Sequence, residues 1–172
     1  MKLSIVIPVF NSSKIIIKLI KSIKKNIKKN TSFEIILIND YSEDSSWKTI
    51  KSLAKKYKFV KGINLNENYG QHYAIFAGLK FAKGKNIICM DDDMQHDPAY
   101  INKIGNVLDR GFDVCYVKYL KRKHSYIKIL VSWLNNIVSS FLMSKPINIY
   151  TSSYKGFKKK VKTNILKTSG RF

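Results

Sequence analysis

The sequence predicts an α/β fold in which an open, mainly parallel sheet carries helices on both faces. Apolar runs at residues 3–7, 33–38, 60–65, 86–90 and 113–118 indicate strands, and helix-like segments separate them. Strands that alternate with helices pair in parallel, because each crossover returns the chain to the same end of the sheet. Polar loops at 8–13, 39–44 and 91–97 follow three of the strands. Ligands of such sheets bind at the carboxyl ends of strands, so we expect these loops to form one crevice.

The first two helices are predicted by apolar residues at helical spacing behind serines that could cap them. Ser12 or Ser13 would begin the first, which ends near Ile27, and Ser45 or Ser46 would begin the second. Each carries isoleucine, leucine or aromatic residues on one side and lysines on the other. We therefore expect both helices to pack on the sheet and to present lysines to solvent.

The later elements follow the same pattern as far as residue 118. A helix is expected at 73–83, closed by Gly84, and another from Pro98 to Gly111. Beyond residue 119, apolar residues at helical spacing in 126–143 predict a helix that either packs on the domain or lies on an anionic membrane surface. A strand at 148–154 and a lysine-rich helix are expected after it.

The charge of the chain is large and unevenly distributed. The 172 residues suit one domain, with 32 Lys and Arg against 11 Asp and Glu and a net charge of +21. All acidic residues lie at or before Asp113, so residues 114–172 are uniformly basic. This balance favours nucleic acid, anionic membranes or phosphate-bearing substrates, although a lysine-rich genomic composition explains part of it.

Cysteine use and hydropathy indicate a reducing compartment. Cys89 and Cys115 lie in apolar, strand-like runs and are expected to be buried thiols. We find no signal peptide and no apolar run of about 18 residues, so a cytoplasmic protein is expected.

Three adjacent acids follow the strand at 86–90. Asp91, Asp92 and Asp93 repel one another and are tolerated best around a divalent cation such as Mg²⁺ or Mn²⁺. In an extended segment Asp91 and Asp93 would point the same way and Asp92 away. Asp40 ends another strand. The set suits a metal-bound diphosphate, with Asp40 holding a ribose or a base edge.

Other common sites are disfavoured by the motifs that they require. The turn after the first strand reads Pro-Val-Phe-Asn at 8–11, without the glycines of a dinucleotide-binding turn, and no P-loop exists. No nucleophile elbow supports Ser–His–Asp chemistry. The three histidines (His72, His96 and His124) lack metal-ligand spacing and are interpreted as surface or crevice residues.

Four segments taken together resemble a known family. Residues 4–11 (SIVIPVFN), 38–44 (INDYSED), 66–79 (NENYGQHYAIFAGL) and 90–95 (MDDDMQ) resemble the family 2 glycosyltransferases, which have the GT-A fold. The segment 66–79 is similar to the branch that includes dolichol-phosphate mannose synthases and bacterial undecaprenyl-phosphate sugar transferases. The resemblance covers the whole chain and is strongest from 1 to 118.

This resemblance implies a donor, an acceptor and a set of site residues. The donor is a nucleotide-diphosphate sugar, the acceptor a polyprenyl phosphate, and the cofactor a divalent metal, Mg²⁺ or Mn²⁺. The expected nucleotide-binding residues are Pro8, Phe10, Asp40, Asn68, Gly70 and Asp91. The expected metal ligands are Asp91, Asp93 and Gln95, of which Asp93 and Gln95 are also catalytic. Lys118 and Lys128 stand where relatives bind phosphates with arginines.

The resemblance also implies a division of the chain and a setting. Residues 1–118 would form the nucleotide-sugar-binding half, and 119–172 a basic, incomplete segment that faces the acceptor and an anionic membrane. The protein would act by inversion at the inner face of the cytoplasmic membrane, in cell-envelope polysaccharide or glycolipid synthesis, without binding nucleic acid. Relatives of this branch continue further, so a truncated chain is expected. An inactive remnant, a metal-dependent nucleotide hydrolase or nucleotidyltransferase, and a nucleic-acid-binding protein stay as alternatives.

Overall fold

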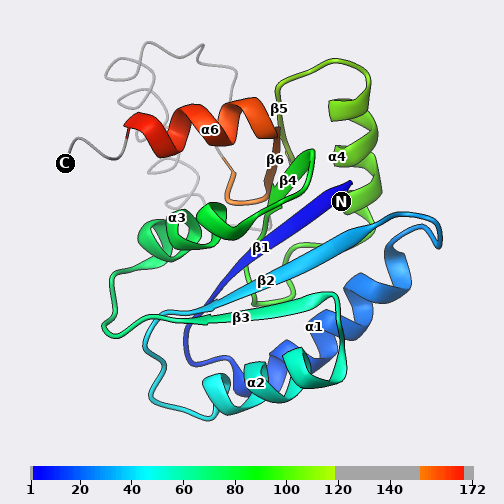
Figure 1. Ribbon diagram of the computed structural model, residues 1–172. Helices are drawn as coiled ribbons and strands as arrows, with labels where there is room; N and C mark the ends of the chain where they lie inside the picture. The colour runs from blue at the N-terminus through cyan, green and yellow to red at the C-terminus, as the bar shows by residue number, and fades with distance from the viewer. Residues whose placement is uncertain (1, 119–151, 169–172) are drawn as a thin grey trace, which may run out of the picture. The chain divides into compact units, whose positions relative to one another are not determined.

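The computed structural model describes residues 2–118 and 152–168 (Figure 1). Residues 2–115 and 153–168 belong to one compact unit built on a sheet with the strand order β3-β2-β1-β4-β6-β5. The strands are β1 (Leu3–Val9), β2 (Phe33–Asn39), β3 (Val60–Asn64), β4 (Asn86–Cys89), β5 (Val114–Tyr116) and β6 (Lys155–Lys158).

The first four strands form a parallel sheet in a common register. β1 pairs with β2 and with β4, and Leu3 lies opposite both Phe33 and Asn86. β2 pairs with β3 in the same direction. The predicted mainly parallel sheet is therefore confirmed, and the carboxyl ends of β1, β2 and β4 reach the same edge.

The sixth strand departs from the parallel pattern. β6 pairs with β4 in the antiparallel direction, with Cys89 opposite Lys155. The strand expected at 148–154 lies partly outside the described residues, and 152–154 are not strand, so the described strand begins later than predicted. A two-residue alternation is too weak to mark such a short, lysine-bounded strand in the sequence.

Helices cover both faces of the sheet. They are α1 (Ser13–Asn26), α2 (Ser46–Lys56), α3 (Gln71–Phe81), α4 (Tyr100–Asp109) and α6 (Lys159–Thr168). Figure 1 shows α3 and α6 on one side of the sheet and α1 and α2 on the other. α4 joins the α1 side, where Asn102 Nδ2 donates to the carbonyl of Asn26 at 2.6 Å. The lysine-rich helix is confirmed as α6, whereas the helix predicted at 126–143 lies outside the described residues.

The core lies between these layers and explains the continuous apolar runs of the strands. Every residue of β1 is buried, as expected for a parallel strand covered on both faces. α3 approaches closely because Gly78 has no side chain: a Cβ there would lie 2.6 Å from Ile38 Cδ1 and 2.7 Å from Val6 Cγ1. α3 begins at Gln71, two residues before the predicted start. Among the described residues, no helix has the length and apolar character needed to span a membrane.

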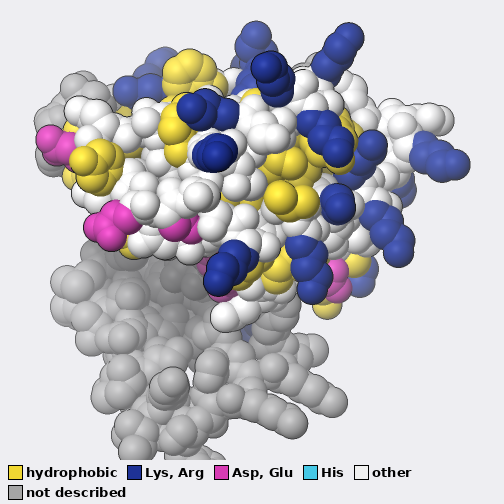
Figure 2. Space-filling model, turned by 90° about the horizontal axis from the view of Figure 1, so that it is seen from below, with side chains coloured by type: hydrophobic (Ala, Val, Ile, Leu, Met, Phe, Trp, Pro, Cys, Tyr) yellow, Lys and Arg dark blue, Asp and Glu magenta, His cyan; other side chains and the backbone are white. Residues whose placement is uncertain are grey.

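Lysines cover the outer side of α1 and α2. Neither helix contains an acidic residue, and all of their lysines are exposed, while Ile16, Leu19, Ile20 and Ile23 of α1 are buried. Figure 2 shows one face of the molecule with many lysine and arginine side chains and few acidic ones among them. The predicted amphipathic character of both helices is confirmed.

A buried carboxylate lies at the amino end of the sheet. Glu34 of β2 is 1% exposed, and its oxygens accept from Lys61 Nζ at 2.6 Å, Ser4 Oγ at 2.7 Å and the Lys83 N–H at 2.8 Å. Burial alone would raise the pKa of Glu34, but these hydrogen bonds outweigh it and hold the pKa below its ordinary value of 4.5. The acid is thus fully satisfied and carries its own counter-charge.

Candidate nucleotide-sugar site

The three polar loops at the carboxyl edge each contain one non-glycine residue in the left-handed region. These residues are Asn11 (φ 51°), Tyr41 (φ 56°) and Met94 (φ 63°). L-residues adopt this conformation at a cost of roughly 1–2 kcal/mol, and such strain collects where surrounding contacts impose it, often at functional sites. The sharp turns reverse the chain directly after β1 and β2 and within the acid-rich loop after β4.

The first two loops are tied together by hydrogen bonds. Asn11 Oδ1 accepts from the Glu43 N–H at 2.9 Å, and Asp44 accepts from the N–H groups of Ser13 (3.0 Å) and Ser46 (2.8 Å). Slight burial would raise the pKa of Asp44, yet the hydrogen bonds from Ser46 and Ser13 lower it to about 2. One carboxylate thereby binds the first turns of both α1 and α2.

The prediction that serine side chains cap the two helices is wrong. Ser12 and Ser45 do occupy the N-cap positions, but neither side chain makes a capping hydrogen bond. At the start of α1 the acceptors come from a distant segment: Asp44 accepts from the Ser13 N–H, and Ser46 Oγ of α2 accepts from the Ser12 N–H at 2.9 Å. At the start of α2, Asp44 accepts from the Ser46 N–H two residues after it, so this end is capped locally.

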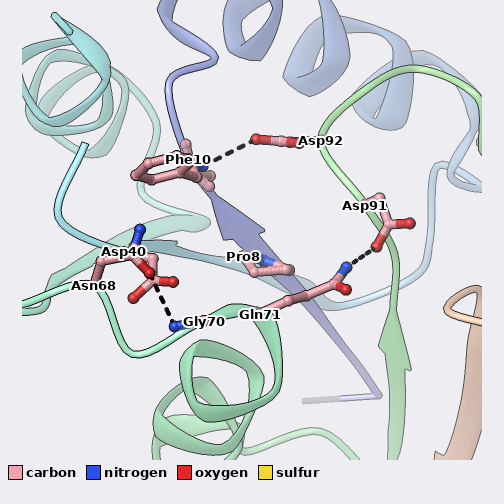
Figure 3. Close-up of a pocket in the computed structure, with 9 residues that line it drawn as sticks. Pro8, Phe10, Asp40, Asn68, Gly70, Gln71, Asp91 and Asp92 are labelled. Atoms are coloured by element: carbon pink, nitrogen blue, oxygen red, sulfur yellow. Dashed lines mark hydrogen bonds between the residues drawn. The ribbon is translucent and has the colours of Figure 1, made fainter. Parts of the chain in front are cut away.

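A pocket of about 260 Å³ opens where the loops converge (Figure 3). All six residues expected to bind the nucleotide line it, so the predicted crevice exists. The lining residues are Pro8, Val9, Phe10, Asp40, Asn68, Gly70, Gln71, Asp91 and Asp92. Apolar groups of β1 and its loop thus face acids of two other loops across one cavity.

The segment between β3 and α3 forms another wall of this pocket. Asp40 is 3% exposed and accepts from the Tyr69 N–H at 2.9 Å, and Asn68 Oδ1 accepts from the Gly70 N–H at 3.1 Å. Gly70, at the N-cap of α3, has a φ of 84°, which favours glycine. These bonds fix the backbone of 68–70 against the end of β2.

The acid cluster does not have the expected geometry. Residues 92–94 form bends, because Asp93 Oδ1 accepts from the Gln95 N–H at 2.9 Å and Met94 is left-handed. The expectation of an extended segment, with Asp91 and Asp93 on one side, is therefore wrong. Asp91 and Asp92 line the pocket, whereas Asp93 and Gln95 are exposed and not among its lining residues.

Asp92 closes the pocket toward the first loop. Its Oδ2 lies 3.4 Å from the Phe10 N–H, as Figure 3 shows. Burial raises the pKa of Asp92, and the nearby Asp93 raises it further, against the hydrogen bonds that lower it. A cation bound here would relieve that repulsion.

Asp91 is bound by three side chains that the sequence did not single out as site residues. Gln71 Nε2 donates to Oδ1 at 2.6 Å, and Ser153 Oγ donates to Oδ2 at 2.7 Å. The Asp91 N–H donates to His96 Nδ1 at 3.0 Å. Gln71 could have been found as the first residue of a helix that starts at the crevice, but Ser153 depends on the unpredicted pairing of β6.

The carboxylates gathered at this pocket make a divalent cation a reasonable occupant. No described Lys or Arg forms an ion pair with Asp40, Asp91, Asp92 or Asp93. The described residues contain no cluster of three or more His, Cys, Asp and Glu that could hold a metal. Mg²⁺-type sites need no such cage, since one or two carboxylates commonly share the ion with substrate phosphates and water. The residues present fit that mode of binding.

Of the two expected phosphate-binding lysines, one lies within the described residues. Lys118 is exposed at the end of the first described range, and Lys128 lies outside the described residues. Their role stays a prediction.

Comparison with solved structures defines the class of fold. The chain superposes on residues 1–349 of TarS from S. aureus in complex with UDP, with a TM-score of 0.68, 23% identity, and coverage of 99% of this chain and 49% of that one. It is also similar to glucosyl-3-phosphoglycerate synthase from Mycobacterium tuberculosis in complex with UDP (TM-score 0.70, 16% identity, 93% and 57% covered). A mannosyltransferase from Pyrobaculum calidifontis, in complex with GDP-Man and Mn²⁺, gives 0.67 at 14% identity, with 95% and 46% covered. The fold is that of the GT-A glycosyltransferases.

Sequence comparison then identifies the family. Residues 4–165 match the model of glycosyl transferase family 2, and the chain belongs to that family. Curated relatives include the undecaprenyl-phosphate 4-deoxy-4-formamido-L-arabinose transferases of Proteus mirabilis (30% identity, 93% of this chain, 50% of the relative) and Salmonella choleraesuis (30%, 99% and 53%). The chain spans about half the length of these relatives.

Proposed function

We propose that this chain binds a nucleotide-diphosphate sugar and takes part in transferring the sugar to a polyprenyl phosphate, with inversion, at the inner face of the cytoplasmic membrane. One observation carries the proposal: the six residues assigned to the nucleotide from sequence line one pocket at the carboxyl edge of a GT-A sheet. The names of the relatives, which act on undecaprenyl phosphate, support the acceptor class.

The pocket suggests how its residues would hold the donor. Phe10 is 48% exposed beside Pro8, and a flat apolar surface of this kind can receive a base. Asp40 also lines the pocket and is fixed by the Tyr69 N–H, which leaves a second oxygen for a ribose hydroxyl or base N–H. The base and ribose would therefore occupy the end of the pocket between the loops of β1 and β2.

The acid cluster would hold the diphosphate end of the donor. Asp91 and Asp93, with Gln95, would bind Mg²⁺ or Mn²⁺, which when bound neutralises charge on the leaving nucleoside diphosphate. Asp93 and Gln95 are exposed and thus accessible to a ligand. Asp91, buried more deeply and bound by Gln71, would set the position of the site relative to α3.

The charge distribution supports an acceptor that is itself an anion. Residues 114–172 hold many lysines and no acidic residue. A lipid phosphate is already ionised, and cations of this kind would attract it. The same lysines would favour an anionic membrane surface.

Titration calorimetry of the purified chain with UDP and GDP, with and without Mn²⁺, tests the donor site. We expect Mn²⁺-dependent binding of one nucleotide, weakened at least about tenfold by Asp93→Asn through loss of an anionic oxygen. Glu43→Gln is the matched control, since it removes one charge from a neighbouring loop where Glu43 is exposed. Absence of binding by a folded wild-type chain, or full binding by Asp93→Asn, would refute the assignment.

Product analysis separates transfer from hydrolysis. A nucleotide-sugar that binds should give lipid-linked sugar when polyprenyl phosphate is present. Release of free sugar at the same rate with and without the lipid would favour the hydrolase alternative.

A further inference from the structure

Both carboxylate oxygens of Asp91 accept hydrogen bonds from protein side chains. Gln71 and Ser153 each donate to one of its oxygens, at 2.6 and 2.7 Å. Both donors are neutral, so the carboxylate keeps its charge, and each oxygen keeps a lone pair for a further ligand. The two bonds restrain rotation of the carboxylate without occupying its full coordinating capacity.

The hydrogen bonds around Asp91 form a closed cycle. The Asp91 N–H donates to His96 Nδ1, so a neutral ring carries its proton on Nε2. Nε2 lies 3.3 Å from Ser153 Oγ and donates to it, and the Ser153 hydroxyl donates to Asp91 Oδ2. Within this cycle each group donates one hydrogen bond and accepts one, and the cycle begins and ends at Asp91. The order of donors fixes both the histidine tautomer and the serine hydroxyl.

His96 is itself held rigidly by the segment that follows Ser153. His96 is 7% exposed, and its ring stacks on Tyr154, with ring centroids 4.7 Å apart and planes at 13°. Tyr154 is fully buried, and its hydroxyl donates to the carbonyl of Asp97 at 3.1 Å. The two ends of the acid loop are therefore packed against residues 153–154.

The strand pairing explains why Ser153 reaches this place. β6 runs antiparallel to β4 with Cys89 opposite Lys155. The same register, continued by two residues, places Ser153 opposite Asp91. Because β6 is anchored by pairing and by Phe157 in the core, Ser153 is delivered by the sheet itself.

We propose that His96 and Ser153 are positioning residues for Asp91, so that the segment leading into β6 completes the donor site. They would orient one carboxylate toward the metal and diphosphate without touching either. This inference rests on the proposed function. It assigns residues 153–154 to the donor site, whereas the sequence placed 119–172 on the acceptor side.

The test compares Mn²⁺-dependent binding of UDP and GDP by matched variants. Ser153→Ala and His96→Phe should each weaken binding in Mn²⁺ about tenfold, in the range found when outer partners of metal ligands are removed. His96→Phe keeps a ring to stack on Tyr154. Ser153→Thr, which retains the hydroxyl, should restore binding, and Ser52→Ala on the exposed side of α2 should leave it unchanged.

Two comparisons distinguish positioning from general destabilisation. Binding in EDTA should be equal for wild type and both variants, and Ser153→Ala should add less than about twofold in an Asp91→Asn background. A loss of equal size in EDTA, or in the Asp91→Asn background, would overturn the inference. Thermal unfolding of each variant establishes that the fold is retained.

Imidazole ¹⁵N NMR of the wild-type chain examines the cycle without nucleotide. The spectrum should show the neutral tautomer of His96 with its proton on Nε2, and the proton on Nδ1 would overturn the inference directly. If wild type binds nucleotide and the variants bind it equally well, only the positioning role is refuted. Wild type that binds neither nucleotide refutes the proposed function and this inference together.

Discussion

Each end of the sheet holds a carboxylate, but the two carboxylates differ in the charge of the groups around them. At the amino end, Glu34 is paired with Lys61 and surrounded by donors. At the carboxyl end, Asp91 accepts from Gln71 and Ser153, both neutral, and no described lysine or arginine pairs with it. Burial of an acid is therefore not by itself a sign of function. An acid held in place but left without a counter-charge is the stronger indication of a cation-binding site.

The largest expected effect is a loss of nucleotide affinity when Asp91, at the carboxyl end of the sheet, is changed. Asp91→Asn should weaken Mn²⁺-dependent nucleotide binding on the order of 100-fold, about 2.7 kcal/mol, because the amide cannot supply an anionic oxygen. Its thermal stability should change little, since Asp91 forms no ion pair with a described Lys or Arg. Calorimetry and thermal unfolding of the same preparation measure both quantities. A large stability loss with intact binding would reverse the roles assigned to the two ends.

Glu34→Gln should give the opposite result. It removes a charged acceptor of several hydrogen bonds, and we expect a loss of about 1–3 kcal/mol in the free energy of unfolding. Lys61 is partly exposed, so water can solvate it in the variant and limit the loss. Urea unfolding measures the change, and nucleotide affinity should stay within about twofold of wild type. Loss of nucleotide binding by a folded Glu34→Gln protein would contradict a purely structural role for Glu34.

Lowering the pH should destabilise the protein through the carboxylate of Glu34. The pKa of Glu34 is lowered in the folded protein, so its contribution is fully present above its ordinary pKa of 4.5 and is lost as the pH falls through the lower folded value. Wild type should therefore lose more stability than Glu34→Gln between pH 5 and the acid limit of folding, by an amount that urea titrations at several pH values determine. Parallel curves for the two proteins would show that Glu34 is not responsible.

The smallest expected effect concerns backbone strain at the carboxyl end. Tyr41 is exposed and left-handed, so Tyr41→Gly relieves roughly 1 kcal/mol of strain but adds flexibility to the unfolded chain. We expect a net stabilisation of up to about 0.5 kcal/mol in urea unfolding. Ser52→Gly on α2 is the control and should destabilise the protein by about 0.5–1 kcal/mol. Destabilisation by Tyr41→Gly of similar size would mean that contacts of the tyrosine outweigh its strain.

The sequence was sufficient where local patterns and general rules of α/β folds agree. Apolar runs located the parallel strands, and the polar residues after β1 and β2 indicated the crevice that Phe10 and Asp40 line. The arrangement of Asp91 to Asp93 was misjudged, because a hydrogen bond to Gln95 and a left-handed Met94 turn the chain in a way that residue type does not reveal.

Contacts made by distant segments could not be read from the sequence. Ser153 reaches Asp91 only through the antiparallel pairing of β6, and Asp44 binds the start of a helix that precedes it by some 30 residues. Such contacts depend on which strands become neighbours, and no spacing within a short window records that choice.

β6 is synthesised well after β4, the strand that it pairs with. Residues that line the pocket end at Asp92, but the strand that covers the outer edge of β4 is synthesised about 65 residues after it. At 5–20 residues per second, roughly 3–13 s pass during which Ile88 and its neighbours present an unpaired strand edge. An open edge of this kind is a template for pairing with other chains. The newborn protein is thus most vulnerable to aggregation after its pocket residues have been translated and before its sheet is finished.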